Sequence, residues 1–307
     1  MNVIGIVRNS GKFMEIAKKI RERWALYSSM EVRLVRVQEA LARIENRQIA
    51  AQGSIGTQAN EFRAFSQWGE DGILQYLIRE TEPESKIFVE FGVETYVESN
   101  TRFLLMNDNW SGLVIDGDED NIQYIRRDPI YWRYNLKAEC SFITAENINE
   151  LISRNGMTGE IGLLSVDIDG NDYWVWKAIQ VVNPIIVVAE YNARFGPTES
   201  VTVPYDPTFV RSVAHYSMIY YGASLAALTN LGNLKGYALV GCNSSGNNAF
   251  FIRRDKLPKS IPEMRPDQAY VRNQFREARA ANGDLAFIDP LAESALLADL
   301  PLIRVGD

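Results

Sequence analysis

Apolar residues recur along this chain with two different periods, and the change between them divides the sequence. From about residue 10 to residue 50 they recur at helical spacing without an intervening proline, which predicts one long helix that Asn9 or Ser10 can cap. From residue 27 onward they lie three, four, three, four and three residues apart, the heptad spacing of a coiled coil. This apolar seam consists of Tyr27, Met30, Leu34, Val37, Leu41 and Ile44. We favour self-association through the seam; the alternative is an amphipathic helix lying on its own domain.

After a small, polar stretch at residues 51–60, interpreted as a linker, short apolar runs alternate with helical segments. The predicted strands are residues 86–92, 112–116, 138–143, 163–167, 185–190, 237–242 and 249–253. The predicted helices are residues 70–82, 101–107, 120–127, 147–154, 173–179 and 223–231. Continuous apolar strands separated by helices indicate a mostly parallel α/β sheet covered on both faces. The last two strands flank the short turn NSSGNN, so we expect a hairpin that closes the sheet with an antiparallel strand.

The remaining residues are expected to form a helical tail, with 267–281 as its clearest segment. The pattern therefore predicts three parts: an N-terminal helix at 1–56, an α/β domain at 57–256, and a helical C-terminal extension at 257–307.

Charge and composition narrow the classes of partner. The net charge of −7 argues against a general nucleic-acid binder, although basic residues gather in the first fifty positions. No apolar run is long enough to span a membrane, and the start of the chain lacks the pattern of a secretory signal. The two cysteines, Cys140 and Cys242, lie in strand-like stretches and suit reduced core thiols. We therefore expect a cytoplasmic protein without a membrane span.

Acidic residues end four of the predicted strands. They are Glu90, Asp116, Asp167 and Glu190. Because the carboxyl ends of parallel strands meet at one edge of a sheet, these side chains should gather there. The predicted strand at 163–167 lies in the segment GLLSVDIDGND, which adds Asp169 and Asp172. Several buried like charges need a cation, a proton or a ligand to compensate them, so this edge is the predicted functional site.

Carboxylate oxygens are the ligands that Mg²⁺ and Mn²⁺ prefer, so Asp167, Asp169 and Glu190 are candidate metal ligands. The loop from Ala193 to Arg211 is long for a simple connection and is a candidate lid over a substrate. The single histidine, His215, lies in an aromatic segment, where a packing or surface role is favoured over a general base.

Several segments together resemble a known family. FVEFG, then GLVID about twenty residues later, then LLSVDIDGND are similar to motifs of class I S-adenosylmethionine-dependent methyltransferases. The order of the segments over residues 60–255 resembles more closely the bacterial FkbM-type group. These segments are SQWGEDGI, FVEFGV, NTRFLL, WSGLVIDGD, SVDIDGNDYWVW, AEYNARF, YGASLAAL, KGYALV and NNAFFIRR. The resemblance implies a Rossmann-like class I methyltransferase fold, here preceded by the long N-terminal helix.

The resemblance also implies roles for residues on the cofactor side. Glu90 and Gly92 would lie against the methionine half of S-adenosylmethionine, and Asp116 would accept hydrogen bonds from its ribose. The implied cofactor-binding set is Gln67, Glu90, Gly92, Asn100, Asp116 and Gly117. Ser66, Gln67, Glu70 and Asp71 would close the cofactor pocket, or else form a helix N-terminus with favourable acids.

The implied catalytic set faces the methyl acceptor and consists of Asp167, Asp169, Glu190 and Asn192. The family pattern usually has glycines where this chain has Glu94 and Tyr96, which puts cofactor affinity in question.

Three hypotheses for function follow. The first is S-adenosylmethionine-dependent O-methylation of a small molecule or saccharide, with a carboxylate base or a divalent metal to activate the hydroxyl. The second is a non-catalytic, methyltransferase-like scaffold that forms a homo-oligomer through the N-terminal helix. The third is a metal-dependent glycosyltransferase, in which Asp167 and Asp169 form a DxD motif.

Overall fold

The computed structural model describes residues 3–306; within the first helix it describes the side chains of residues 15, 18–23, 30 and 32 onward. Two compact units divide the chain, residues 1–45 and 46–307. The predicted long helix is confirmed as α1 (Val3–Gln52), but its predicted start is wrong: Asn9 and Ser10 lie inside the helix and do not cap it. Along the apolar seam, Met30, Leu34, Val37, Leu41 and Ile44 are between 50 and 65% exposed. Tyr27, the first position of the seam, lies outside the described side chains, so self-association stays a prediction.

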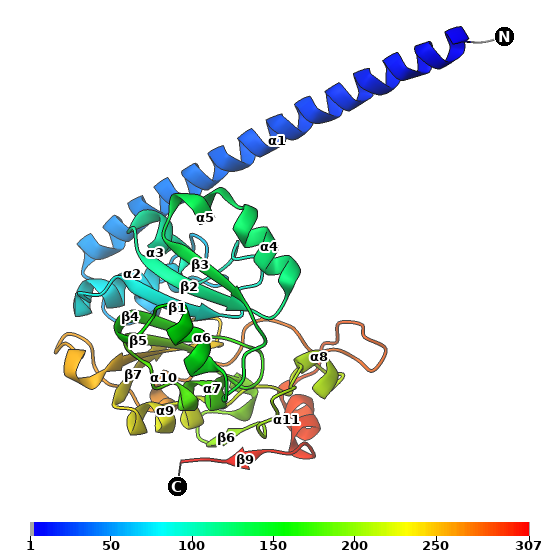
Figure 1. The fold of residues 1–307 in the computed structure, drawn as a ribbon. Coiled ribbons are helices and arrows are strands. Elements are labelled where there is room, and N and C mark those ends of the chain that lie inside the picture. Colours follow the sequence, from blue (N-terminus) through cyan, green and yellow to red (C-terminus); the bar gives the residue numbers. More distant parts are fainter. Residues whose placement is uncertain (1–2, 307) are drawn as a thin grey trace. The chain divides into compact units, whose positions relative to one another are not determined.

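The second unit is built on a seven-stranded sheet with the order β3-β2-β1-β4-β5-β8-β7 (Figure 1). Its strands are β1 (Ile87–Phe91), β2 (Ser111–Asp116), β3 (Leu136–Cys140), β4 (Gly159–Val166), β5 (Val182–Glu190), β7 (Tyr237–Cys242) and β8 (Asn248–Arg253). The first five are parallel, whereas β8 runs antiparallel to both of its neighbours. This is the predicted mostly parallel sheet with an antiparallel closing strand, and the strand order reverses between β1 and β4.

Alternate residues of each strand enter two separate cores, because successive side chains of a strand point to opposite faces. On β5, Val187 packs in one core and Ile186 in the other. The second core is covered by α2 (Glu70–Thr81), α3 (Arg102–Asn107), α4 (Glu119–Arg127) and α5 (Pro129–Arg133). The first is covered by α6 (Ile148–Arg154), α7 (Asp172–Ala178) and α9 (Leu225–Leu234). The sheet is therefore buried on both faces, and the fold is the expected Rossmann-like α/β fold with a mostly parallel sheet.

The prediction of a helical C-terminal tail is wrong for most of its length. Its clearest predicted segment, 267–281, is helical only in α10 (Pro266–Ala269), and a further helix, α11 (Pro290–Ala298), lies beyond it. Residues 270–279 instead form hydrogen bonds to distant parts of the unit. Tyr191 donates its hydroxyl to the carbonyl of Val271, and the amide of Gln274 donates to the carbonyl of Ser245. These tertiary bonds replace the bonds that a helix would supply.

The second unit also contains short elements that the pattern did not predict. They are 3₁₀ turns at Gln58–Asn60, Ala193–Phe195 and Arg254–Lys256, helix α8 (Arg211–Ala214), and strands β6 (Val201–Thr202) and β9 (Ile303–Arg304), which pair with each other. A small third core joins the loop, the tail and α11. The C-terminal residues thus pack as part of the second unit.

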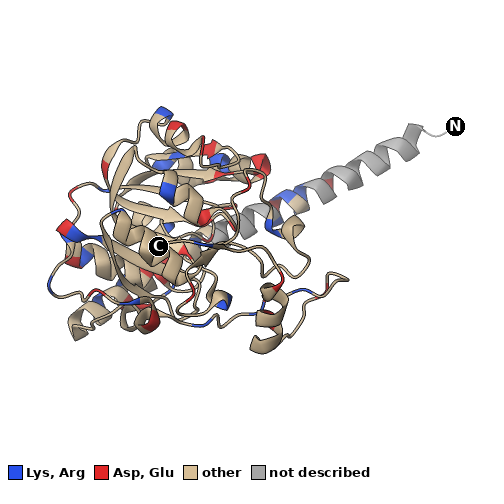
Figure 2. Cartoon of the chain, turned by 90° about the horizontal axis from the view of Figure 1, so that it is seen from below, with Lys and Arg blue, Asp and Glu red and all other residues tan. Residues whose placement is uncertain are grey.

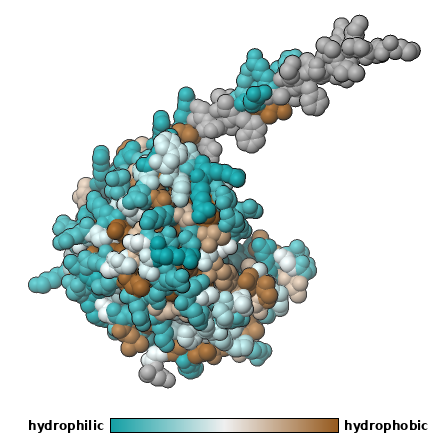
Figure 3. Space-filling view, viewed as in Figure 1, coloured by the Kyte–Doolittle hydropathy of each residue, from teal (hydrophilic) through white to brown (hydrophobic). Residues whose placement is uncertain are grey.

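The surface of the second unit is polar. Figure 2 shows acidic and basic residues on its helices and loops and few along its strands, and the face seen in Figure 3 is mostly hydrophilic. Among the residues that the structure describes, no helix is both long and apolar enough to cross a membrane.

Candidate functional site

One row across the carboxyl edge of the sheet carries three of the acids that the sequence singled out, together with a glycine and an asparagine. Glu190 pairs directly with Asn248, and the pairing of Val166 with Ala189 continues to place Asp167 beside Glu190. In the same way, the β1 registers place Gly92 between Asp116 and Asp167. The row therefore reads Asp116, Gly92, Asp167, Glu190 and Asn248. The expectation that the strand-end acids gather at one edge is confirmed.

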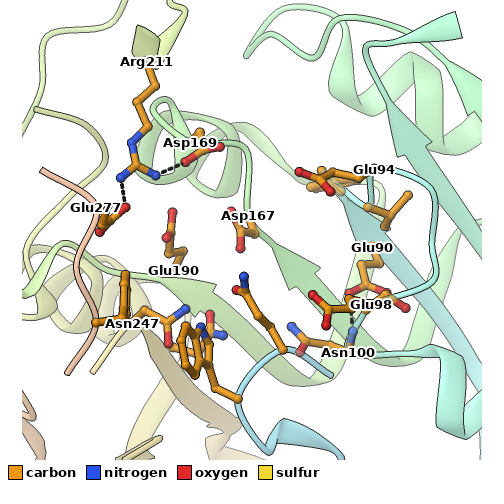
Figure 4. Close-up of a pocket in the computed structure, with 18 of the residues that line it drawn as sticks. Glu90, Glu94, Glu98, Asn100, Asp167, Asp169, Glu190, Arg211, Asn247 and Glu277 are labelled. Carbon is orange, nitrogen blue, oxygen red and sulfur yellow. Dashed lines mark hydrogen bonds and ion pairs between the residues drawn. The ribbon is translucent and has the colours of Figure 1, made fainter. Parts of the chain in front are cut away.

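A cavity of about 420 Å³ opens over this row (Figure 4). This volume lies within the range of about 300–1,000 Å³ usual for small-molecule sites. Its walls come from the row, from the loop after β1, from the residues before α2, from α8, from the β7–β8 hairpin and from the C-terminal tail. The lining residues are Gln67, Trp68, Glu90, Phe91, Gly92, Val93, Glu94, Glu98, Ser99, Asn100, Asp167, Asp169, Glu190, Arg211, Asn247, Asn248, Phe275, Arg276 and Glu277.

Three carboxylates of this cavity form a cluster. Asp167, Asp169 and Glu190 each bring an oxygen within 4.8 Å of the other two. Burial raises the pKa of both Asp167 and Glu190 well above the ordinary range, and the neighbouring negative charges raise each pKa further. Glu190 is only 7% exposed, and its Oε2 has no hydrogen-bond partner among the described residues. The cluster therefore suits either a retained proton or a bound cation.

A fourth acid shapes the loop that carries the cluster. The carboxylate of Asp172 accepts hydrogen bonds from the amides of Ile168 (2.8 Å) and Gly170 (2.9 Å). Between them, Asp169 adopts a left-handed conformation with φ of 56°. Burial raises the pKa of Asp172 to about 6. This side chain thus holds the turn that turns Asp169 toward the cavity.

Arg211 is the cation that faces this cluster. Its guanidinium donates to Asp169 (2.5 Å) and to Glu277, and it stacks over the ring of Tyr221 at 3.7 Å. Arg211 ends the loop that the sequence predicted to be a lid, and Glu277 belongs to the C-terminal tail. One side chain therefore ties the loop, the tail and the acidic turn together; whether the loop opens stays a prediction.

The loop after β1 keeps a backbone shape that glycines usually adopt. Gly92 has φ of +65°, and a Cβ there would lie 1.9 Å from the carbonyl oxygen of Asp167. Glu94 and Tyr96, at positions where the family that the sequence resembles usually has glycines, also have positive φ values of 47° and 60°. The Tyr96 ring is fully buried and its hydroxyl lies 2.9 Å from that of Thr101, while Glu94 lines the cavity. The substitutions thus change the side chains at the site but preserve the backbone path.

Four of the predicted cofactor-binding residues line the cavity: Gln67, Glu90, Gly92 and Asn100. Glu90 accepts hydrogen bonds from the amides of Asn100 (2.8 Å) and Thr101 (3.1 Å), and burial raises its pKa to about 7. The amide side chain of Asn100 donates to Ser165 at 3.0 Å. These contacts fix the wall of the cavity on the β1 side.

The other two, Asp116 and Gly117, do not line the cavity. The carboxylate of Asp116 accepts from the amides of Glu94 (2.7 Å) and Asp118 (2.9 Å) and from the side chain of Asn121 (3.1 Å). With about four lone pairs on a carboxylate, these three donors leave one for a ligand. Gly117 is exposed beyond the edge. The roles of both residues stay predictions.

Asn192, predicted beside the acceptor, is fully buried outside the cavity. Its side-chain nitrogen donates to the carbonyls of Ile219 (2.8 Å) and Tyr221 (3.0 Å), so it positions the segment that follows the lid loop. His215 contacts the hydroxyl of Ser217 at 2.6 Å and the ring of Tyr216, in keeping with the favoured packing role.

The residues before α2 divide between the two alternatives left open by the sequence. Asp71 accepts hydrogen bonds from the amides of Ala64, Phe65 and Ser66 and from the Ser66 hydroxyl, so this pair organises the helix start. Gln67 lines the cavity. Glu70, fully buried, bonds the β7–β8 hairpin instead.

Several cavity residues were missed by the sequence analysis. Asn247 and Asn248 could have been found, because an antiparallel strand begins at the edge where its parallel neighbours end. Trp68 stacks on Phe275 with ring centroids 5.0 Å apart. Glu277, which also lines the cavity, belongs to the same tail segment as Phe275. The tail residues gave no signal, because their position depends on the tertiary bonds of an irregular segment.

Comparisons with known proteins are distant. No family model matches the chain, and no curated protein matches it. Among solved structures, it is similar to the N-terminal domain of EvdMO1 with SAH bound, at 11% identity, covering 68% of this chain and 94% of that chain, with a TM-score of 0.39. It is also similar to an O-methyltransferase from Bacillus cereus in complex with SAH, at 13% identity, covering 69% and 89%, with a TM-score of 0.39.

Proposed function

We propose that this chain is an S-adenosylmethionine-dependent O-methyltransferase of FkbM-like type that acts on a small molecule or a saccharide. The observation that carries the proposal is the row at the carboxyl edge of the sheet, where a glycine turn adjoins the half-buried carboxylate of Asp167 and the buried carboxylate of Glu190, both with raised pKa values. In sheets of this topology, ligands bind at the edge where the strand order reverses, which is here between β1 and β4.

The residues of the cavity fit the cofactor in its charge and in part of its contacts. A lining with seven acids, Glu90, Glu94, Glu98, Asp167, Asp169, Glu190 and Glu277, against the two cations Arg211 and Arg276, suits a positively charged sulfonium. Gln67, Glu90, Gly92 and Asn100 would hold its methionine half, and Asp116 and Gly117 its ribose. When bound, S-adenosylmethionine supplies a methyl group that is activated for transfer to a nucleophile.

Asp167 and Glu190 supply the base. A carboxylate whose pKa is raised by burial and by neighbouring charge accepts a proton more readily near neutral pH than an exposed one. One of the two carboxylates would take the proton from the acceptor's hydroxyl group. Arg211, held beside Asp169, limits the excess negative charge of the cluster.

A divalent ion, Mg²⁺ or Mn²⁺, is the second part of the proposal. Asp167, Asp169 and Glu190 would hold it, since their oxygens converge and Glu190 Oε2 lacks a partner among the described residues. Such an ion lowers the pKa of a hydroxyl group bound to it and so assists its deprotonation.

Calorimetry with S-adenosylhomocysteine, and with UDP-sugars in the presence of Mn²⁺, tests the proposal. We expect S-adenosylhomocysteine to bind. Binding of a UDP-sugar that requires Mn²⁺ would favour a glycosyltransferase instead, and binding of neither would favour the non-catalytic scaffold.

Self-association through α1 completes the proposal. The described positions of the apolar seam expose Leu34, Val37, Leu41 and Ile44 along one helix, and a second copy of the helix would bury them. The expected location is cytoplasmic.

A further inference from the structure

Two unpartnered hydrogen-bond acceptors lie side by side in the cavity. Glu190 on β5 and Asn248 on β8 are directly paired across the strands, so their side chains are neighbours on one face of the sheet. Asn248 is 4% exposed, and its Oδ1, like Glu190 Oε2, has no hydrogen-bond partner among the described residues. Both residues line the cavity. Buried acceptors without donors are costly, so this pair points to a ligand that donates hydrogen bonds.

The direction of the Asn248 amide is set by Glu70. This fully buried carboxylate accepts hydrogen bonds from the side-chain nitrogens of Asn248 (2.8 Å) and Asn243 (2.7 Å) through Oε1, and from the amide of Trp68 (3.0 Å) through Oε2. Glu70 Oε1 accepts from the nitrogens of both asparagines, so the nitrogen of Asn248 faces Glu70. The Asn248 oxygen therefore faces the cavity, and the hydrogen bond to Glu70 fixes this orientation of the amide.

The hairpin that carries Asn248 is held rigidly by the same network. The Asn243 oxygen accepts from the amides of Gly246, Asn247 and Asn248, and its nitrogen donates to the Asn247 oxygen as well as to Glu70. A side chain fixed in this way is preorganised, so a ligand loses little free energy in ordering it.

Part of the lining of the cavity is aromatic. Trp68 and Phe275 stack at 5.0 Å with their planes 19° apart, and both line the cavity. An aromatic surface in the same cavity as fixed acceptors suits a molecule with an apolar C–H face and several hydroxyl groups. A sugar ring has both.

We propose that Asn248 binds the methyl acceptor, by receiving a hydrogen bond from one hydroxyl group of a polyol while Glu190 receives one from its neighbour. Glu70 is a positioning residue that turns the Asn248 oxygen toward the cavity. This inference rests on the proposed function and names a substrate class, a saccharide or similar polyol, for the same site.

The test is saturation-transfer NMR on the full chain with S-adenosylhomocysteine present. The probes are methyl α-D-glucopyranoside, methyl α-L-rhamnopyranoside and myo-inositol, with catechol and ethanolamine as non-polyol comparisons. The variants are Asn248→Ala, Glu70→Gln and the double variant Glu70→Gln/Asn248→Asp. Asn183→Ala, at the other end of β5, is the matched control because it lies outside this cavity.

We expect at least one polyol to bind the wild type, and Asn248→Ala to weaken it about tenfold, the usual effect of one hydrogen bond. Glu70→Gln should also weaken polyol binding, because a glutamine can present its nitrogen to the hairpin and so allow the Asn248 amide to reverse. The double variant should restore binding, since its new glutamine side chain can donate to its new aspartate, which remains an acceptor. Asn183→Ala should match the wild type.

Equal polyol binding by wild type and Asn248→Ala would overturn the role of Asn248. Failure of the double variant to recover would overturn the positioning role of Glu70. Binding of catechol or ethanolamine but of none of the three polyols would overturn the substrate class. Calorimetry with S-adenosylhomocysteine is run beside each variant: if the wild type fails to bind it, the proposed function fails, whereas if it binds while no polyol does, only this inference fails.

Discussion

Replacing Gly92 with alanine tests why the row at the sheet edge needs a glycine. The new Cβ would lie 1.9 Å from the carbonyl oxygen of Asp167, whereas ordinary contacts begin near 3.4 Å. The two backbones would have to separate by about 1.5 Å, the difference between these two distances, or the loop after β1 would have to turn away. Either movement disturbs the row at the sheet edge in the protein without any ligand.

The cost has two parts. A left-handed conformation costs a residue with a side chain about 1–2 kcal/mol relative to glycine. Forcing an atom into a packed region typically costs a further 1–3 kcal/mol. Gly92→Ala should therefore destabilise the fold by about 2–5 kcal/mol, a large part of the stability of an average domain.

Gly159 supplies the matched control. It has a similar φ of +73° at the start of β4, but a Cβ there meets nothing within 4 Å. Gly159→Ala should thus cost only the conformational part, about 1–2 kcal/mol. Urea unfolding of the two variants and the wild type, followed by circular dichroism, measures both values. If Gly92→Ala is no less stable than Gly159→Ala, the contact with Asp167 is not what requires the glycine.

Three further predictions concern binding, pH and assembly. Asp116→Ala should weaken the binding of S-adenosylhomocysteine about 10- to 100-fold in calorimetry, as expected for lost hydrogen bonds to a charged group, whereas Asp167→Ala should leave this binding unchanged. Normal binding by Asp116→Ala would show that the ribose lies elsewhere. The free energy of unfolding should fall as pH rises from about 4.5 to 7, because Glu90 has a pKa of about 7 in the folded state and 4.5 in the unfolded state, so the folded state binds more protons in this range. A urea midpoint that rises over the same range would contradict this. Leu34→Asp should reduce the solution mass to that of one chain, 34.7 kDa, while Arg36→Asp beside the seam should not; light scattering that gives one chain for the wild type would exclude self-association.

The sequence predicted the sheet well because its strands are buried on both faces. Continuous apolar runs such as IIVVAE can only be central strands, and the acid that ends each run marks the edge where the chain leaves the core. Glu90, Asp167 and Glu190 therefore appeared together before any coordinates. Boundaries shifted by a few residues where strands extended beyond their apolar runs, as at the start of β4.

What the sequence could not predict depends on partners far away in the chain. Residues 270–279 have a helical pattern, yet bonds to Tyr191, Ser245 and Ser217 hold them in an irregular path. The cluster of Arg211 with Asp169 and Glu277 likewise joins three segments that no local pattern connects. The positive φ of Glu94 could not be predicted, because glycine is the usual sequence signal for such a conformation and this position is not a glycine.

The wall formed by residues 275–277 bears on how the site arises during synthesis. Glu190 leaves the ribosome 87 residues before Glu277, since 277 less 190 is 87. At the usual 5–20 residues per second this is a delay of about 4–17 s. Throughout that interval the nascent chain holds the acids of the sheet but neither Phe275 for the aromatic wall nor Glu277 for Arg211. Ribosome-bound chains therefore lack the complete cavity until the C-terminal tail has been synthesised.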